Sequence, residues 1–160
     1  MTEKSYSMMG RPSLALTLST IATLIVSPYS SRAQLLPPAK PAAHVKIIKG
    51  PALESAVPDM ATLRWTSTNP GGDDDHYAVA HYGTDPHDLS ETARSHIRLN
   101  RNHPETIFRV RLIGLKPQTT YYYWVTSMGS GGRIDPAKSG INQFTTPSPG
   151  KVITAYPQPK

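Results

Sequence analysis

The sequence contains no cysteine, and this absence sets the first limits on the protein. Without thiols the chain cannot form a disulfide-stapled scaffold or a cysteine-ligated metal centre. No cysteine follows its main apolar run, so a lipid-anchored lipoprotein is also excluded. The folded part must therefore be stabilised by an apolar core, which a domain of about 100 residues can supply.

Long hydrophobic runs are scarce as well. The main one, residues 14–26, has 13 residues, whereas a membrane-spanning helix needs about 20. It follows a basic leader, ends before Pro28, and precedes small residues that suit a cleavage after Ala33. We therefore expect residues 1–33 to be a signal peptide, with an uncleaved membrane anchor as the alternative. No stable membrane span is expected once the signal is removed.

Charge of neither sign is concentrated enough to identify a partner. Residues 1–33 hold three of the 17 Lys and Arg and one of the 11 Asp and Glu, so the remainder carries 14 and 10, a net charge of +4. Nucleic-acid binding requires a basic cluster, and these residues are dispersed, so no nucleic-acid partner is predicted. An exported chain without cysteine suits a periplasmic or secreted protein.

Of the 16 Pro and 11 Gly of the chain, 14 and 10 lie after residue 33, where they punctuate the sequence. Between them lie short β-rich runs with alternating apolar residues, which predict an all-β antiparallel sandwich. The seven expected strands are 45–48, 61–66, 76–83, 94–99, 106–113, 121–128 and 142–146. The expected division is a signal peptide (1–33), a Pro/Ala-rich extended segment (34–44), one domain (45–147) and a Pro-rich tail (148–160).

The densest pattern is a corner between the fifth and sixth expected strands. Gly114 and Pro117 turn the chain, and Tyr121 follows directly. A tyrosine in this position can bury its ring and use its hydroxyl to bond the backbone a few residues upstream. The residues expected to form the core are Leu63, Trp65, Phe108, Val110, Leu112, Leu115, Tyr121, Tyr123, Val125 and Phe144.

These features resemble the fibronectin type III family. The Gly-Leu-x-Pro-x-Thr-x-Tyr block of residues 114–121, Trp65 on the second expected strand, and the Phe-Thr-Thr-Pro run of residues 144–147 all match its pattern. The resemblance covers residues 47–147. It implies a seven-stranded, immunoglobulin-like β-sandwich.

A narrower resemblance lies within the same region. Tyr82-Gly83-Thr84-x-Pro86-x-x-Leu89, the Thr-Tyr-Tyr-Tyr run of residues 120–123 and the Phe-x-Thr-Pro of residues 144–147 look like the non-catalytic N-terminal domain of purple acid phosphatases. In those enzymes a dinuclear-metal phosphoesterase domain follows. Only 13 residues follow Pro147 here, without a metal-ligand motif, so the hydrolase activity is not implied for this chain.

The residue types that support catalysis or metal binding form no recognisable site. His76 and His81 are five apart on one expected strand and therefore face opposite sides. Asp73-Asp74-Asp75 lacks the spacing of a calcium loop, and the Gly-rich loop from residue 129 lacks the ending of a phosphate loop. Arg133-Ile134-Asp135 in that loop lacks the central glycine of an integrin-binding motif. The histidines expected to be solvated are His44, His76, His81, His87, His96 and His103.

One surface feature is not explained by the core. Strand alternation that turns Tyr121 inward turns Tyr122 and Trp124 outward. On the third expected strand, one register turns Tyr77 and Val79 outward beside them, whereas the other buries both and leaves Tyr122 and Trp124 alone or under the Pro-rich N-terminal segment. The predicted interaction face consists of Tyr122, Trp124, Met128, Tyr77, Val79 and His81.

The sequence therefore predicts an exported, monomeric, non-catalytic fibronectin type III domain. It would act as an interaction or accessory module for an unidentified protein or carbohydrate. One alternative is the N-terminal accessory domain of a purple acid phosphatase-like metallophosphoesterase without its catalytic domain, and another is a surface adhesin. No cofactor, metal or catalytic residue is expected in any of these cases.

Overall fold

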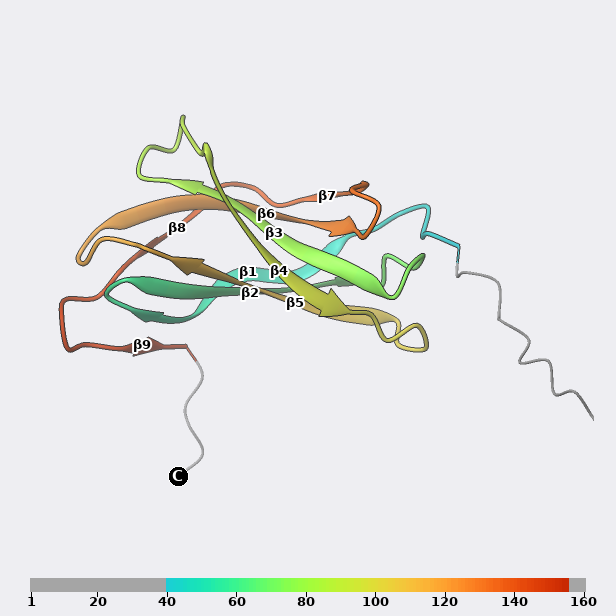
Figure 1. The fold of residues 1–160 in the computed structure, drawn as a ribbon, viewed down its shortest axis with the longest axis horizontal. Coiled ribbons are helices and arrows are strands. Elements are labelled where there is room, and N and C mark those ends of the chain that lie inside the picture. Colours follow the sequence, from blue (N-terminus) through green and yellow to red (C-terminus); the bar gives the residue numbers. More distant parts are fainter. Residues whose placement is uncertain (1–39, 156–160) are drawn as a thin grey trace, which may run out of the picture. The chain divides into compact units, whose positions relative to one another are not determined.

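The computed structural model describes residues 40–155, in which all regular structure is β (Figure 1). The expected signal peptide lies outside these residues. No helix in the described range is long and apolar enough to cross a membrane. The nine strands of this range are β1 (Ile47–Val57), β2 (Met60–Thr68), β3 (Asp75–Gly83), β4 (Glu91–Arg98), β5 (Glu105–Ile113), β6 (Thr120–Gly129), β7 (Ile134–Lys138), β8 (Asn142–Thr145) and β9 (Ile153–Thr154).

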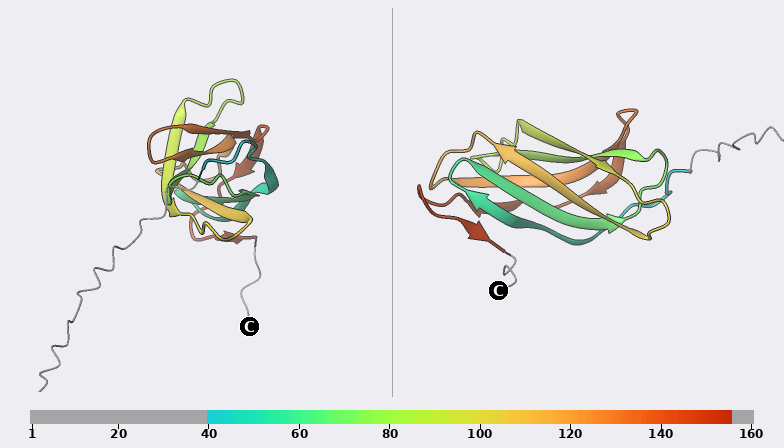
Figure 2. Two further views of the ribbon diagram at one scale, coloured as in Figure 1. Left: turned by 90° about the vertical axis from the view of Figure 1, so that its right-hand side faces the viewer. Right: turned by 60° about the horizontal axis from the view of Figure 1, so that its bottom comes forward.

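The strands form two antiparallel sheets, seen from two further sides in Figure 2. Sheet 1 has the order β5-β2-β1-β9, and sheet 2 has the order β4-β3-β6-β7 with β8 also paired to β6. β7 pairs with the second half of β6 through Thr126 and Lys138, and β8 pairs with its first half through Thr120 and Thr145. β7 and β8 are therefore one interrupted edge strand. Together with β1 to β6 they form the expected seven-stranded sandwich, to which β9 is added.

The core lies between the two sheets and contains all ten residues that the sequence predicts for it. Trp65 on β2 pairs in register with Phe108 on β5, and their rings stack with centroids 5.3 Å apart. From sheet 2, Tyr121 and Tyr123 pack against Phe144 of β8. Burial raises the pKa of Tyr123 to about 12, because the phenolate would be poorly solvated there.

The corner before β6 has the predicted geometry. Gly114 has a φ of +74°, a conformation in which glycine carries no steric penalty. The hydroxyl oxygen of Tyr121 accepts a hydrogen bond of 2.9 Å from the backbone N–H of Lys116. The predicted bond to the upstream backbone is thus confirmed, and it joins the start of β6 to the turn after β5.

The first strand differs from the sequence expectation. The first expected strand, 45–48, stops before the turn signal Gly50-Pro51, but β1 continues through several register shifts to Val57. Gly50 has a φ of +77°, and a Cβ there would lie 2.9 Å from the carbonyl oxygen of Arg64. Only glycine lets β1 approach β2 so closely, and the strand therefore passes the turn signal instead of stopping at it.

The two flanking segments also take part in the fold where the structure describes them. In the segment expected to be an extended spacer, the backbone N–H of Ala42 donates to the carbonyl oxygen of Pro70 at 2.7 Å. In the segment expected to be a tail, Ile153 and Thr154 pair with Ala56 and Ser55 of β1. Backbone pairing of this kind needs no side-chain pattern, so composition gave no sign of it.

Candidate functional site

The third strand has the register that exposes the predicted face. Ala78, Ala80 and Tyr82 of β3 point to the core, so the alternate residues point to the outer side of sheet 2. These residues pair with the outward residues of β6: Tyr77 with Met128, Val79 with Thr126, and His81 with Trp124. The structure thus places all six predicted residues on one side of the sheet. We call Tyr77, Val79, His81, Tyr122, Trp124 and Met128 the aromatic face.

Trp124 lies at the centre of this face with a partner on each side of its ring. The imidazole of His81 on β3 is parallel to the indole, with centroids 4.0 Å apart and planes 10° apart. From β7, on the opposite side of β6, the Nζ atom of Lys138 lies over the ring, 3.9 Å from its centroid. Two groups so close to one centroid cannot share a ring face, so the indole stands between a stacked imidazole and a cation.

Val79 does not contribute exposed surface, contrary to the sequence expectation. Its side chain points outward but is only 5% exposed, and Thr126 beside it is 2% exposed. Larger side chains surround Val79 on its own strand, namely Tyr77 and His81, and Arg94 lies opposite it on β4. Val79 therefore forms the floor of the aromatic face, whose half-buried rings form its walls.

The middle of the aromatic face is electropositive. The pKa of His81 is lowered first by burial and then by the charges of Lys138 and Arg94. Both cations are exposed, and within residues 40–155 neither forms an ion pair with a carboxylate. The carboxylate of β3, Asp75, lies at the start of the strand and is 3.0 Å from Nε2 of His96 on β4. The centre of the face therefore presents positive charge beside aromatic rings.

A buried polar cluster was not expected from the sequence. His76 is 2% exposed rather than solvated, and Asp135 lies on β7, 2% exposed, rather than in a flexible loop. The hydroxyl of Ser127 donates to Asp135 Oδ2, and His76 Nε2 lies 3.9 Å from the same oxygen. The sequence signal closest to this result is strand alternation. His76 lies an even number of residues before the inward-facing Tyr82 and therefore points to the same side of β3.

The cluster contains the residue types of a serine hydrolase without the required arrangement. A catalytic serine bonds the imidazole that takes up its proton, but here the hydroxyl of Ser127 bonds the carboxylate of Asp135. The side chain of Asp135 is fully buried, and Arg133 Nη2 lies 3.7 Å from its Oδ1. The arrangement braces β6 against β7 beside the start of β3 and presents no activated nucleophile.

The acidic run before β3 does not converge on one point. Asp73 accepts a hydrogen bond from the Ser130 hydroxyl at 2.7 Å, and Asp74 pairs with Arg98 and Arg101. Among the described residues, no three His, Cys, Asp or Glu side chains are grouped so that they could hold a metal ion. Asp73 and Asp74 instead hold neighbouring loops in place, and Asp75 joins the start of β3 to His96 on β4.

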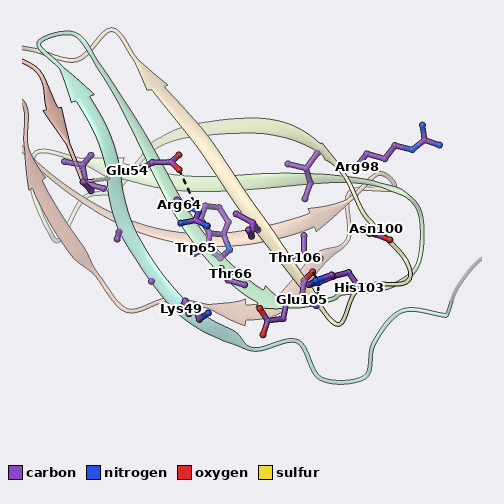
Figure 3. A pocket seen from close by; sticks show the side chains of 16 residues that line it. Lys49, Glu54, Arg64, Trp65, Thr66, Arg98, Asn100, His103, Glu105 and Thr106 are labelled. Atoms are coloured by element: carbon purple, nitrogen blue, oxygen red, sulfur yellow. Dashed lines mark hydrogen bonds and ion pairs between the residues drawn. The ribbon is translucent and has the colours of Figure 1, made fainter. Parts of the chain in front are cut away.

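A hollow of about 890 Å³ is lined by residues of sheet 1 and by the end of β4 in sheet 2 (Figure 3). Lys49 and Glu54 of β1, Arg64 of β2, Ile107 of β5 and the loop after β4 line it. Glu54 accepts two hydrogen bonds from Arg109 Nε, at 3.0 and 2.8 Å, and lies 3.8 Å from Arg64 Nε. Glu54 thus offsets part of the positive charge of the two arginines, while Lys49 also lines the hollow.

The fold defines the class of protein. The sandwich has the paired sheets, the Trp65 core and the tyrosine corner of a fibronectin type III-like domain. Residues 51–146 match the family described as "Purple acid Phosphatase, N-terminal domain". The match spans more than half of the chain, and the protein belongs to this family.

Solved structures with similar folds come from several sources. The sensor domain of the anti-sigma factor RsgI4 of Pseudobacteroides cellulosolvens is 19% identical, with a TM-score of 0.43, covering 71% of this chain and 98% of that one. The fn3 domain of human contactin 1 is 14% identical, with a TM-score of 0.41, covering 78% and 95%. The FN5 domain of Drosophila Lar is 17% identical, with a TM-score of 0.35, covering 63% and 99%. No curated protein sequence matches the chain.

Proposed function

We propose that this protein is an exported accessory domain without catalysis of its own, which binds a partner protein or a carbohydrate through the aromatic face. In this proposal residues 1–33 are removed after Ala33, and the domain acts as a monomer in the periplasm or outside the cell. Its family membership supports an accessory role, because the family is a terminal domain named separately from the catalytic part.

The observation that carries the proposal is the ordered aromatic set on sheet 2. Tyr77, His81, Tyr122, Trp124 and Met128 are half-buried on two adjacent strands, and Trp124 is held between two neighbours. Tyr and Trp are the residue types that most often dominate binding interfaces, and ordered side chains lose little entropy on binding. A rigid aromatic patch on a sheet of charged edge residues is therefore suited to docking.

An affinity capture from the native envelope fraction tests this proposal. The wild-type domain is compared with a Tyr122→Ser/Trp124→Ser double variant. Ile113→Ser is the matched control, because Ile113 is 69% exposed on β5 of sheet 1. We expect the double variant to lose the captured partner and the control to retain it, with circular dichroism showing both folded. Equal capture by all three proteins would refute the proposal.

A second candidate function follows from the match to residues 51–146. The domain would then serve a metallophosphoesterase, either by docking to its catalytic domain or by positioning its substrate. The isolated chain should show no phosphatase turnover with added Fe and Zn. Clear turnover would contradict the non-catalytic assignment, and capture of a metallophosphoesterase by the wild-type domain would favour this second candidate.

A further inference from the structure

The aromatic face is not shaped for stacking against a neutral sugar ring. Carbohydrate recognition of that kind needs an aromatic ring with one open face, and both faces of Trp124 are occupied by His81 and Lys138. Tyr77 is also engaged, edge to face with His96 at a centroid distance of 5.6 Å. Tyr122 alone, among these three rings, has no ring or cation contact in the described structure. One tyrosine is a small platform for an oligosaccharide.

The same surface provides two cations whose charge is not neutralised. Lys138 and Arg94 are exposed, lie on opposite sides of the His81–Trp124 pair, and form no ion pair within residues 40–155. Other exposed cations of this range, such as Arg111 and Lys151, also form no ion pair, but Arg94 and Lys138 are the ones whose charges act on His81 of the aromatic face. The two cations of the aromatic face are thus available to a partner's anionic groups.

We propose that the partner is a protein whose docking surface carries Asp or Glu side chains, which reach Lys138 and Arg94 while apolar groups pack against Tyr122 and Met128. This inference rests on the proposed function, since it names the partner class for the same face. Asp and Glu side chains are flexible, and two of them can move independently. Their carboxylates can therefore reach the two cations that lie on either side of the Trp124 ring. The cations' effect in lowering the pKa of His81 agrees with a positive potential here.

Titration by ¹⁵N NMR tests the chemistry directly. The chain has two tryptophans, and Trp65 is buried, so the indole N–H signal of Trp124 reports on the face. The main probe is poly-L-glutamate. Poly-L-lysine is the polypeptide of opposite charge, polygalacturonate is an acidic carbohydrate, and cellohexaose is a neutral one. We expect poly-L-glutamate to shift Trp124 and the β3, β6 and β7 amides, and its affinity to fall with salt. Tighter binding of polygalacturonate or cellohexaose would overturn the assignment to a protein partner.

A charge-neutral variant isolates the two cations. Arg94→Gln/Lys138→Gln should weaken poly-L-glutamate binding about tenfold or more, because two charge-assisted contacts are lost. Arg111→Gln/Lys151→Gln removes the same charge from exposed positions outside sheet 2 and should leave the affinity nearly unchanged. Equal weakening by the two double variants would mean that only net charge matters, and would overturn the proposal.

Capture of the native partner separates this inference from the proposed function. If Tyr122→Ser/Trp124→Ser abolishes capture and Arg94→Gln/Lys138→Gln does not, the aromatic face binds a partner but the acidic class is wrong. If neither variant changes capture, both ideas fail. Loss with both variants, and retention with Arg111→Gln/Lys151→Gln, supports both.

Discussion

The imidazole of His81 and the indole of Trp124 lie parallel, 4.0 Å apart between centroids, on directly paired residues of β3 and β6. This stack fixes the centre of the aromatic face before any partner arrives. His81 is titratable and lies within the influence of the Lys138 and Arg94 charges, so the charge of the face depends on pH. A change in the protonation of His81 would alter the charge of the surface that we propose for docking.

The pKa of His81 should rise when Lys138 is neutralised. Burial is the larger cause of the lowered pKa, followed by the charges of Lys138 and Arg94. Lys138→Gln removes one of these repulsions, so protonation becomes easier and the pKa moves up toward the usual value of about 6.5. A proton NMR titration of the imidazole resonances measures it. Lys151→Gln, outside sheet 2, should leave the pKa of His81 unchanged. An equal rise of this pKa in both variants would contradict a local effect of Lys138.

Stability should fall in mild acid because of His81. A histidine whose folded pKa lies below its unfolded value binds a proton more readily when unfolded, so unfolding is favoured as pH drops. The contribution is fully present above the unfolded pKa of about 6.5 and is lost as pH falls through the folded value. Urea unfolding of the wild type and His81→Gln at several pH values from 7.5 downward should show a smaller decrease for the variant. If the free energy of unfolding falls equally with pH in the two proteins, His81 is not a cause of the decrease.

Removal of one hydroxyl should weaken the corner. Tyr121→Phe leaves the N–H of Lys116 without its 2.9 Å acceptor in a partly buried turn. We expect a loss of about 1 kcal/mol in the free energy of unfolding. Tyr122→Phe, at the neighbouring outward residue, serves as the control. It should change the free energy of unfolding by only about a few tenths of a kcal/mol. Urea denaturation curves with unchanged m-values measure both, and equal losses would contradict the assigned role.

Truncation of the central tryptophan should cost much more. Trp65 is 2% exposed and stacks on Phe108, so Trp65→Ala leaves a cavity between the sheets. The expected loss is about 3–5 kcal/mol, comparable to the whole stability of a small domain. Trp65→Phe, which keeps an aromatic ring, should lose markedly less and remain folded. Thermal unfolding followed by circular dichroism measures the melting temperature of both variants and of the wild type. A melting temperature of Trp65→Ala close to that of the wild type would refute the central role of Trp65.

The buried cluster behind β7 should behave as a coupled unit. Asp135→Ala removes the acceptor of the Ser127 hydroxyl and the carboxylate beside His76. We expect a loss of about 1–3 kcal/mol, the usual cost of a buried polar group without its partner. Ser127→Ala combined with Asp135→Ala should cost less than the sum of the two single changes. Strict additivity would show that the contact contributes nothing to stability.

The fold of this protein follows largely from local patterns in its sequence. Alternation around Trp65 and Phe108 identified two core strands, because side chains on a strand alternate between its faces. The corner ending at Tyr121 was predictable because turn chemistry and the tyrosine hydroxyl act within a few residues. Each of these signals lies within a short stretch of chain.

Tertiary structure decided what lies between segments far apart. The approach of His76 to Asp135 joins β3 to β7, and the continuation of β1 depends on the close approach of Gly50 to Arg64 of β2. β9 pairs through its backbone, which no side-chain pattern records. Strand alternation placed Tyr122 and Trp124 on the outer side of β6, but it left the register of β3 open and gave no sign of the charge on this face. Lys138 lies over Trp124 only because β7 returns beside β6, and a contact between sequence-distant strands is fixed by their register.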